Sequence, residues 1–144
     1  MHTVKDILEQ KGGEVVSMVA AESVLNAARL MNEREIGGVV VTDGDRMVGV
    51  FTERDILRRV VSEQLDPAAT PLRDVMTRDV VTCRTDTKLE ECVAIFTSRR
   101  IRHLPVVEED GIKGVITSGD ILAFQMKEQK DTIDFLRAYV FDTR

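Results

Sequence analysis

Two copies of one short polar pattern carry the chemistry that this sequence offers. Thr52 and Asp55 stand in a Gly-x-x-Thr-x-x-Asp run, and the same run returns at Thr117 and Asp120. In each copy an apolar stretch ends at the threonine and helix-forming residues follow, which predicts a strand that turns into a helix. Free N–H groups at a helix start favour phosphate, and an aspartate carboxylate can accept hydrogen bonds from both hydroxyls of a ribose. The pattern therefore predicts a duplicated site for a ribose and its phosphate.

The same pattern has a purely structural interpretation. Thr-x-x-Asp resembles a capping box, in which the hydroxyl accepts from a backbone N–H and the carboxylate reaches back to the cap residue. Glu or Gln is the usual partner in that motif, and Asp is short for the return bond. A helix cap and a ribose clamp are compatible, so both interpretations stay open.

The repeat extends well beyond these runs and predicts one β-α-β-β-α unit used twice. Each unit opens with a short apolar segment, continues through a strand and an amphipathic helix, and ends with a β-hairpin and a second helix. The segments are 4–8, 15–18, 24–31, 38–41, 47–51 and 52–64 in the first unit, and 72–76, 80–83, 89–96, 104–107, 112–116 and 117–127 in the second. One unit has too small a sheet to bury both faces. We therefore expect an α/β (α+β) fold in which two repeats pack as a pseudo-two-fold pair.

The predicted boundaries are repeat 1 at residues 1–65, a linker at 66–71, repeat 2 at 72–127 and a C-terminal tail at 128–144. Two prolines in the linker stop the preceding helix. In the tail, Ile133, Leu136 and Val140 fall on one helical face, with Phe135 and Tyr139 beside it. The tail is either a terminal helix packed on its own domain or a contact with a second copy or another protein.

Composition limits the class of protein, its compartment and its partners. The chain has 144 residues, of which 43% are hydrophobic and 31% charged, as is typical of a globular domain that folds without cross-links. We expect neither a membrane span nor export, because no apolar run approaches ~20 residues and the N-terminus has no signal-peptide core. Cys83 and Cys92 fit neither a metal-binding nor a redox spacing, so we expect reduced thiols in a cytoplasmic protein. The net charge of −5 argues against nucleic acid as a partner.

Both repeats resemble cystathionine-β-synthase (CBS) domains, and the pair resembles a Bateman module. The resemblance rests on the duplicated Gly-x-x-Thr-x-x-Asp, on the Ile-x-x-Leu-Pro-Val-Val run at 101–107 and on its counterpart at 36–42. It implies a regulatory module without catalytic activity or a catalytic cofactor. The implied regulatory ligands contain adenosine, namely AMP, ADP, ATP, S-adenosylmethionine and sometimes NADH.

The resemblance also implies two clefts between the repeats, each with its ribose clamp from one repeat and much of its wall from the other. The residues implied for the first cleft are Thr52, Arg54, Asp55, Val80, Val81, Arg102 and His103. The residues implied for the second cleft are Val15, Val16, Gly37, Gly38, Thr117 and Asp120. In the first cleft, adenine would lie against the backbone around Val80 and Val81.

The two implied clefts differ in charge. Arg102 and His103 of the first cleft stand at the places that Gly37 and Gly38 hold in the second. Arginine offers bidentate, charge-assisted hydrogen bonds to phosphate, whereas glycine offers its backbone alone. We therefore expect the phosphorylated ligand in the first cleft. We expect the second cleft to be empty, weak or selective for an uncharged nucleoside part.

Each basic residue also has a structural interpretation. The run at 99–103 fits a solvated helix end whose dipole it complements. Arg54, which stands opposite Gly119 in the repeat, either contacts phosphate or lies in solvent. His103 either contacts the ligand or serves as a structural side chain. These alternatives stay open.

Two other functions compete with a nucleotide sensor. An enzyme is disfavoured, because the sequence shows no Ser/His/Asp set, metal cluster or Walker-type loop and has 2 histidines in all. A ligand-independent interaction scaffold with vestigial clefts remains, since the apolar helices leave surface for a partner. We expect a cytoplasmic regulatory sensor of an adenosyl ligand that forms a homodimer and acts on a target protein that the sequence does not name.

Overall fold

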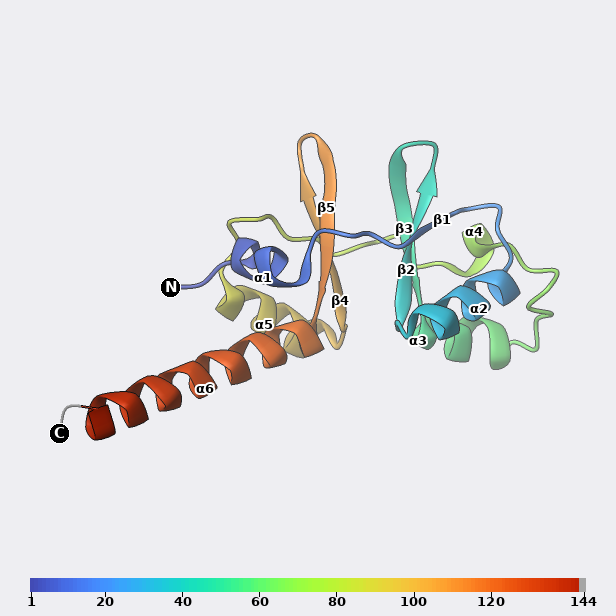
Figure 1. Cartoon of the computed structure of the whole chain (residues 1–144). Helices are drawn as coiled ribbons and strands as arrows, with labels where there is room; N and C mark the ends of the chain where they lie inside the picture. Colours follow the sequence, from blue (N-terminus) through green and yellow to red (C-terminus); the bar gives the residue numbers. More distant parts are fainter. Residues whose placement is uncertain (143–144) are drawn as a thin grey trace.

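The two repeats form two lobes that stand side by side, each built on its own small sheet (Figure 1). The structure, a computed structural model, describes residues 1–142. In the first lobe, β1 (Ser17–Val19) pairs in parallel with β2 (Gly38–Asp43), which pairs antiparallel with β3 (Arg46–Thr52). In the second lobe, β4 (His103–Glu108) and β5 (Gly111–Thr117) form an antiparallel hairpin. This tandem arrangement of helices and small sheets confirms the predicted fold class.

Most of the predicted helices and both hairpins are present. Gly44 and Gly111 lie at the hairpin turns with φ of 64° and 122°, in the region that glycine adopts without strain. The helix predicted at 52–64 begins as a short α-helix and continues with π-helical hydrogen bonding. The helical elements are α1 (Val4–Lys11), α2 (Val24–Arg34), α3 (Glu53–Asp55) with its continuation η1 (Ile56–Val61), α4 (Leu72–Val75), α5 (Leu89–Arg99) and α6 (Ser118–Asp142).

The strand predicted at 80–83 is wrong, and a proline explains the difference. In the first lobe, the Val40 N–H donates to the carbonyl of Val16 and extends the parallel pairing. Pro105 stands at the equivalent place in the second lobe and has no N–H to donate. The segment is held there by an isolated bridge, in which the Cys83 N–H donates to the Pro105 carbonyl over 2.9 Å.

Each repeat packs its opening helix on the other lobe. Val4 and Ile7 of α1 belong to the second lobe's core, together with Leu104 and Ile116. The reverse holds for α4, whose Leu72 and Val75 belong to the first lobe's core beside Val41 and Phe51. Figure 1 shows the N-terminal segment crossing from α1 beside one sheet to β1 in the other. The two hydrophobic cores are therefore built from both repeats.

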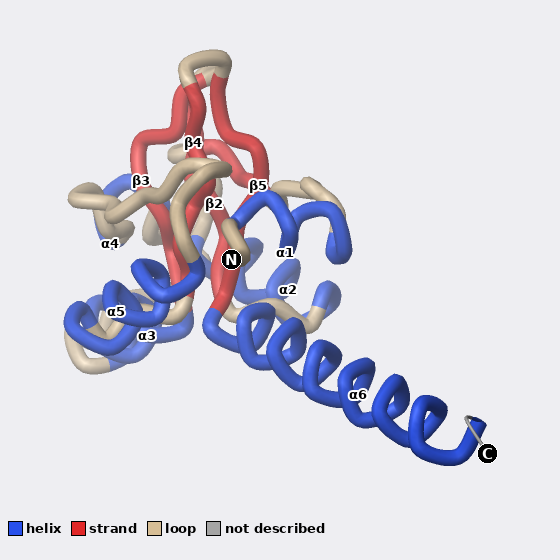
Figure 2. The backbone as a smooth tube through the Cα atoms, turned by 90° about the vertical axis from the view of Figure 1, so that its left-hand side faces the viewer, coloured by secondary structure: helices blue, strands red, loops and turns tan. Residues whose placement is uncertain are grey.

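The predicted tail continues the last helix of repeat 2 without a break, as α6. Figure 2 shows α6 leaving the lobes and running into solvent. Ile133, Phe135, Leu136, Tyr139 and Val140 are all exposed, so a tail packed on its own domain is wrong. The last two residues of the predicted tail, 143–144, lie outside the described residues. No helix in the described part of the chain is both long and apolar enough to cross a membrane.

The exchange of opening helices predicts that Leu72→Ala destabilises the protein through the first lobe. Leu72 is fully buried there, and removing a buried leucine side chain costs about 2–5 kcal/mol of the free energy of unfolding. Denaturant unfolding of the variant measures this cost. Val93→Ala on the exposed face of α5 is the control, with an expected change within about 0.5 kcal/mol. A Leu72→Ala protein as stable as this control would contradict the exchange.

Candidate functional site

Two clefts lie between the lobes, one at each Thr-x-x-Asp turn. The first cleft, around Thr52 and Asp55, has a volume of about 330 Å³. The second cleft, around Thr117 and Asp120, has a volume of about 370 Å³. Both threonines end the last strand of their hairpin, and both aspartates lie in the first turn of the helix that follows. Each cleft is lined by strands or turns of both lobes, so a ligand in either one touches both.

Five of the residues implied for the first cleft do line it: Thr52, Arg54, Asp55, Arg102 and His103. Val80 and Val81 do not line it, and Val81 packs instead against the second lobe's core. The segment before Cys83 does not pair with β4, because Pro105 has no N–H to donate to it. The apolar wall of this cleft comes from Val50, Leu57 and Ile101.

Asp55 is a structural cap as well as a cleft residue. Its side chain is 7% exposed. The Thr52 backbone N–H donates to Oδ2 over 3.0 Å, and the Thr77 hydroxyl donates to Oδ1 over 2.9 Å. The capping box that the sequence allows is therefore formed, with the aspartate reaching back to the threonine N–H. This geometry fixes the carboxylate at the cleft wall and leaves little of its surface for a ligand.

The first cleft gathers three guanidinium groups. Arg54 and Arg58 lie on the same face of α3 and η1, and Arg102 comes from the other lobe just before β4. None of the three forms an ion pair with any residue among 1–142 that the structure describes. Arg58 was missed by sequence reasoning, although its spacing of one helical turn from Arg54 was a usable signal. Glu53 is the one exposed carboxylate among the residues that line this cleft.

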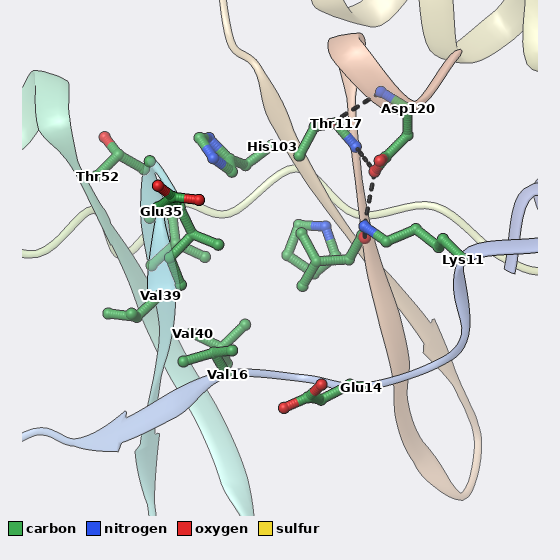
Figure 3. Close-up of a pocket in the computed structure, with 16 residues that line it drawn as sticks. Lys11, Glu14, Val16, Glu35, Val39, Val40, Thr52, His103, Thr117 and Asp120 are labelled. Atoms are coloured by element: carbon green, nitrogen blue, oxygen red, sulfur yellow. Dashed lines mark hydrogen bonds and ion pairs between the residues drawn. The ribbon is translucent and has the colours of Figure 1, made fainter. Parts of the chain in front are cut away.

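Five of the six residues implied for the second cleft line it: Val16, Gly37, Gly38, Thr117 and Asp120. Val15 does not. Figure 3 shows the valines of β2 and Val16 on one side of the cleft, and Thr117 with Asp120 on the other. Three ionisable residues that sequence reasoning missed also line it: Lys11, Glu14 and Glu35.

Lys11 occupies one oxygen of the second aspartate. Its ammonium donates to Asp120 Oδ2 over 2.6 Å and to the Val115 carbonyl over 2.7 Å. The same Oδ2 accepts the Thr117 backbone N–H over 2.8 Å, as in the first cleft. Lys11 ends α1, which belongs to repeat 1 but packs on the second lobe. No motif marks this lysine, and the helix exchange alone brings it to the cleft.

The two aspartates are thus held by reciprocal partners. Thr77 follows α4 and donates to Asp55, while Lys11 ends α1 and donates to Asp120. Each donor comes from the opening segment of the repeat that does not contain the aspartate. The exchange of opening segments therefore shapes both clefts, with a neutral donor in the first and a cation in the second.

His103 lies between the clefts and lines both of them. Its imidazole reaches Gly37, where an added Cβ would lie 3.3 Å from the His103 Cε1 and 2.7 Å from the Glu53 Oε1. Burial lowers the pKa of His103, with Lys11 and Arg102 acting in the same direction. The carboxylates of Glu53 and Asp120 oppose this shift. A substitution at Gly37 would therefore disturb the first cleft too.

These features define a class of protein: a tandem-repeat module with two ligand-sized clefts between interlocked lobes. The family model described as CBS domain matches residues 4–62 and 72–127. The chain belongs to the CBS-domain family. CBS domains are regulatory modules that often bind adenosine-containing ligands.

Three similar proteins illustrate the family. The CBS domain-containing protein CBSX3, mitochondrial, of Arabidopsis thaliana is 29% identical over 147 residues, which cover 96% of this chain and 71% of that protein. The crystal structure of a CBS-domain-containing protein from Agrobacterium tumefaciens superposes with a TM-score of 0.82 at 34% identity, covering 86% of this chain and 99% of that one. An inosine-5'-monophosphate dehydrogenase of Nitrosopumilus maritimus is 36% identical over 107 residues, which cover 73% of this chain and 21% of the enzyme.

The burial of His103 predicts a pKa below its ordinary value of 6.5. Because the folded-state pKa is depressed, the unfolded state takes up a proton first as the pH falls through 6.5. Stability should therefore decrease from about pH 6.5 down to the folded pKa, and His103→Gln should remove that part of the slope. An NMR titration of the His103 ring, assigned by comparison with His103→Gln, measures the midpoint. A midpoint at or above 6.5 would contradict this reading of the site.

Proposed function

We propose that this protein is a non-catalytic regulatory module that binds an adenine nucleotide (AMP, ADP or ATP) or S-adenosylmethionine between its lobes. The observation that carries the proposal is the first cleft, where three unpaired arginines converge beside the Thr52–Asp55 turn. Arginine recognises phosphate through bidentate, charge-assisted hydrogen bonds. A cleft of about 330 Å³ is within the range of small-ligand sites. The family membership supports an adenosine-containing ligand.

The first cleft is the proposed site of the phosphorylated ligand. The ribose lies at Thr52 and Asp55, and the phosphates extend toward Arg54, Arg58 and Arg102. Adenine lies against the apolar wall in place of the valine backbone that the sequence had implied. His103 faces the same phosphates, and their negative charge would raise its pKa and favour its protonated form. Nucleotide binding is therefore coupled to proton uptake at this imidazole.

The second cleft is the proposed site of a weakly bound or uncharged ligand. Glu14, Glu35 and Asp120 bring three carboxylates to it, and Lys11 is the one lysine or arginine among the described residues that line it. Asp120 pairs with Lys11, Glu14 pairs with Arg34 outside the lining, and Glu35 forms no ion pair with the described residues. Repulsion from the carboxylates disfavours a polyphosphate there. Asp120 Oδ1 accepts no hydrogen bond from the described residues and stays available to a ribose hydroxyl. An adenosyl group without phosphates, including the positively charged S-adenosylmethionine, fits this charge balance.

The proposed mechanism is a population shift between orientations of the two lobes. A ligand held by arginines of both lobes binds best to one relative orientation and increases its population. The change is passed to a target protein, or to a second copy of this chain, through surfaces that move with the lobes. No bond is made or broken in this mechanism.

We also propose that the protein forms a homodimer, with apolar helix surface as its contact. Leu57 and Val61 of η1 are 62% and 60% exposed, and the equivalent Leu122 and Met126 of α6 are 59% and 61% exposed. Large apolar side chains exposed at matching positions of both repeats are typical of an interaction surface. This surface also supports the second candidate function, a ligand-independent scaffold, which differs from the sensor in giving no response to nucleotide.

The cytoplasm is the proposed compartment. Cys83 and Cys92 are buried, unpaired thiols in contact within the second core. Their mutual hydrogen bond, followed by burial, raises the pKa of Cys83, so this thiol stays protonated and unreactive. Reduced, unbridged cysteines fit a reducing compartment. The net charge of −5 supports the proposal that nucleic acid is not a partner.

Arg102→Ala should weaken nucleotide binding, with Arg99→Ala as the matched control. Arg102 lines the first cleft, whereas Arg99 ends α5, is exposed and lines neither cleft. Losing charge-assisted hydrogen bonds to phosphate should raise the dissociation constant roughly 10- to 100-fold. Titration calorimetry with AMP, ADP, ATP, S-adenosylmethionine and NADH measures this and identifies the ligand. Equal losses in both variants would contradict the assignment, and no binding of any of these ligands to the wild type would favour the scaffold.

A further inference from the structure

An exposed apolar seam runs along the whole of α6. Its six positions follow one another at alternating steps of four and three residues, as in a coiled-coil heptad. Gln129 is the polar member of this seam. The α6 seam consists of Leu122, Met126, Gln129, Ile133, Leu136 and Val140.

The α6 seam is separate from the face with which the helix packs on its own lobe. Ile121 and Phe124 are 3% and 6% exposed and belong to the second lobe's core. The apolar members of the seam are between 48% and 61% exposed. Figure 2 shows the C-terminal part of α6 running away from both lobes. A helix that projects alone into water is marginally stable, so a partner along this seam would stabilise it.

We propose that, in the homodimer proposed above, on which this inference rests, the α6 seam pairs with the α6 seam of the second copy as a parallel two-stranded coiled coil. This pairing continues the contact at Leu122 and Met126 along the rest of α6. The heptad assignment places Met126, Ile133 and Val140 at a positions. It places Leu122, Gln129 and Leu136 at d positions. β-branched residues at a with leucine at d favour two parallel strands. A single polar residue in the seam, here Gln129, favours one register because it must face its own copy.

Charge selects the parallel arrangement over the antiparallel one. The e positions carry Lys130 and Arg137, and the neighbouring g positions carry Gln125 and Thr132. In a parallel pair, g faces e of the other chain, so each cation meets a neutral polar side chain. In an antiparallel pair, e faces e, and the cations of the two chains would lie close together. The 25 residues of α6 span about 37 Å, which is long enough for all six layers of the seam.

Disulfide cross-linking tests both the partner and its direction. Leu122→Cys and Leu136→Cys each place one accessible thiol on the seam, and Asp131→Cys places one on the opposite face as the control. Cys83 and Cys92 are buried and do not compete. A parallel pair in register links both seam variants into covalent dimers on mild oxidation and leaves Asp131→Cys unlinked. An antiparallel pair can bring at most one of the two seam positions against its own copy.

Any outcome other than linkage at both seam positions without linkage at Asp131→Cys overturns the proposal. Linkage at one position indicates an antiparallel pair, and equal linkage at Asp131→Cys indicates random collision. A monomer without linkage at either position shows that two copies do not pair along the seam.

A double variant that introduces charge into the seam tests dimer formation independently of cross-linking. Ile133→Glu combined with Leu136→Glu puts two carboxylates per chain into the seam, and we expect the dimer dissociation constant to rise at least about 100-fold. Phe135→Glu is the matched control, because Phe135 is 69% exposed but lies at a c position, off the seam. Analytical ultracentrifugation measures association, and unfolding curves confirm that the lobes remain folded. Equal weakening by both changes, or by neither, contradicts the coiled coil.

Discussion

The packing of each opening helix on the lobe of the other repeat is the constraint on which the rest of this structure depends. Neither lobe can complete its core from its own repeat, because α1 and α4 supply buried side chains to the opposite one. The chain must therefore cross between the lobes twice, and the crossings hold the two lobes side by side. A two-stranded hairpin alone is marginally stable and needs helices packed against it, and the exchanged helix is one of those that cover each sheet. The exchange makes a single folding unit from two repeats that are each too small.

The same exchange determines the chemistry of the clefts. The end of α1 places Lys11 against Asp120, and the segment after α4 places Thr77 against Asp55. Each cleft is therefore built from residues of both repeats. A ligand that alters either contact acts directly on the crossing segment, and through it on the other lobe's core. His103, which lines both clefts, adds a second connection between them. The pseudo-symmetry of the repeats is broken at these few residues. The difference in charge between the clefts has another origin: three arginines line the first cleft, and three carboxylates line the second.

Local patterns predicted much of the fold and of the site, because these features depend on neighbours in the sequence. The hairpins, the helix starts and the Thr-x-x-Asp turns are of this kind. The missing strand at 80–83 was predictable in principle, since Pro105 stands where Val40 donates in the first lobe. The position of Lys11 in the second cleft was not predictable, because it depends on the packing of α1 against the other repeat. The continuity of α6 was not predicted, because the last helix was expected to end with repeat 2 at residue 127.

Differential scanning calorimetry shows directly whether the two lobes are interlocked. If both cores contain segments of both repeats, neither lobe can unfold while the other stays native. We then expect one transition whose calorimetric enthalpy per mole of chain does not exceed its van't Hoff enthalpy. Two resolved transitions, or a calorimetric enthalpy well above the van't Hoff value, would show that the lobes unfold independently and would contradict the account.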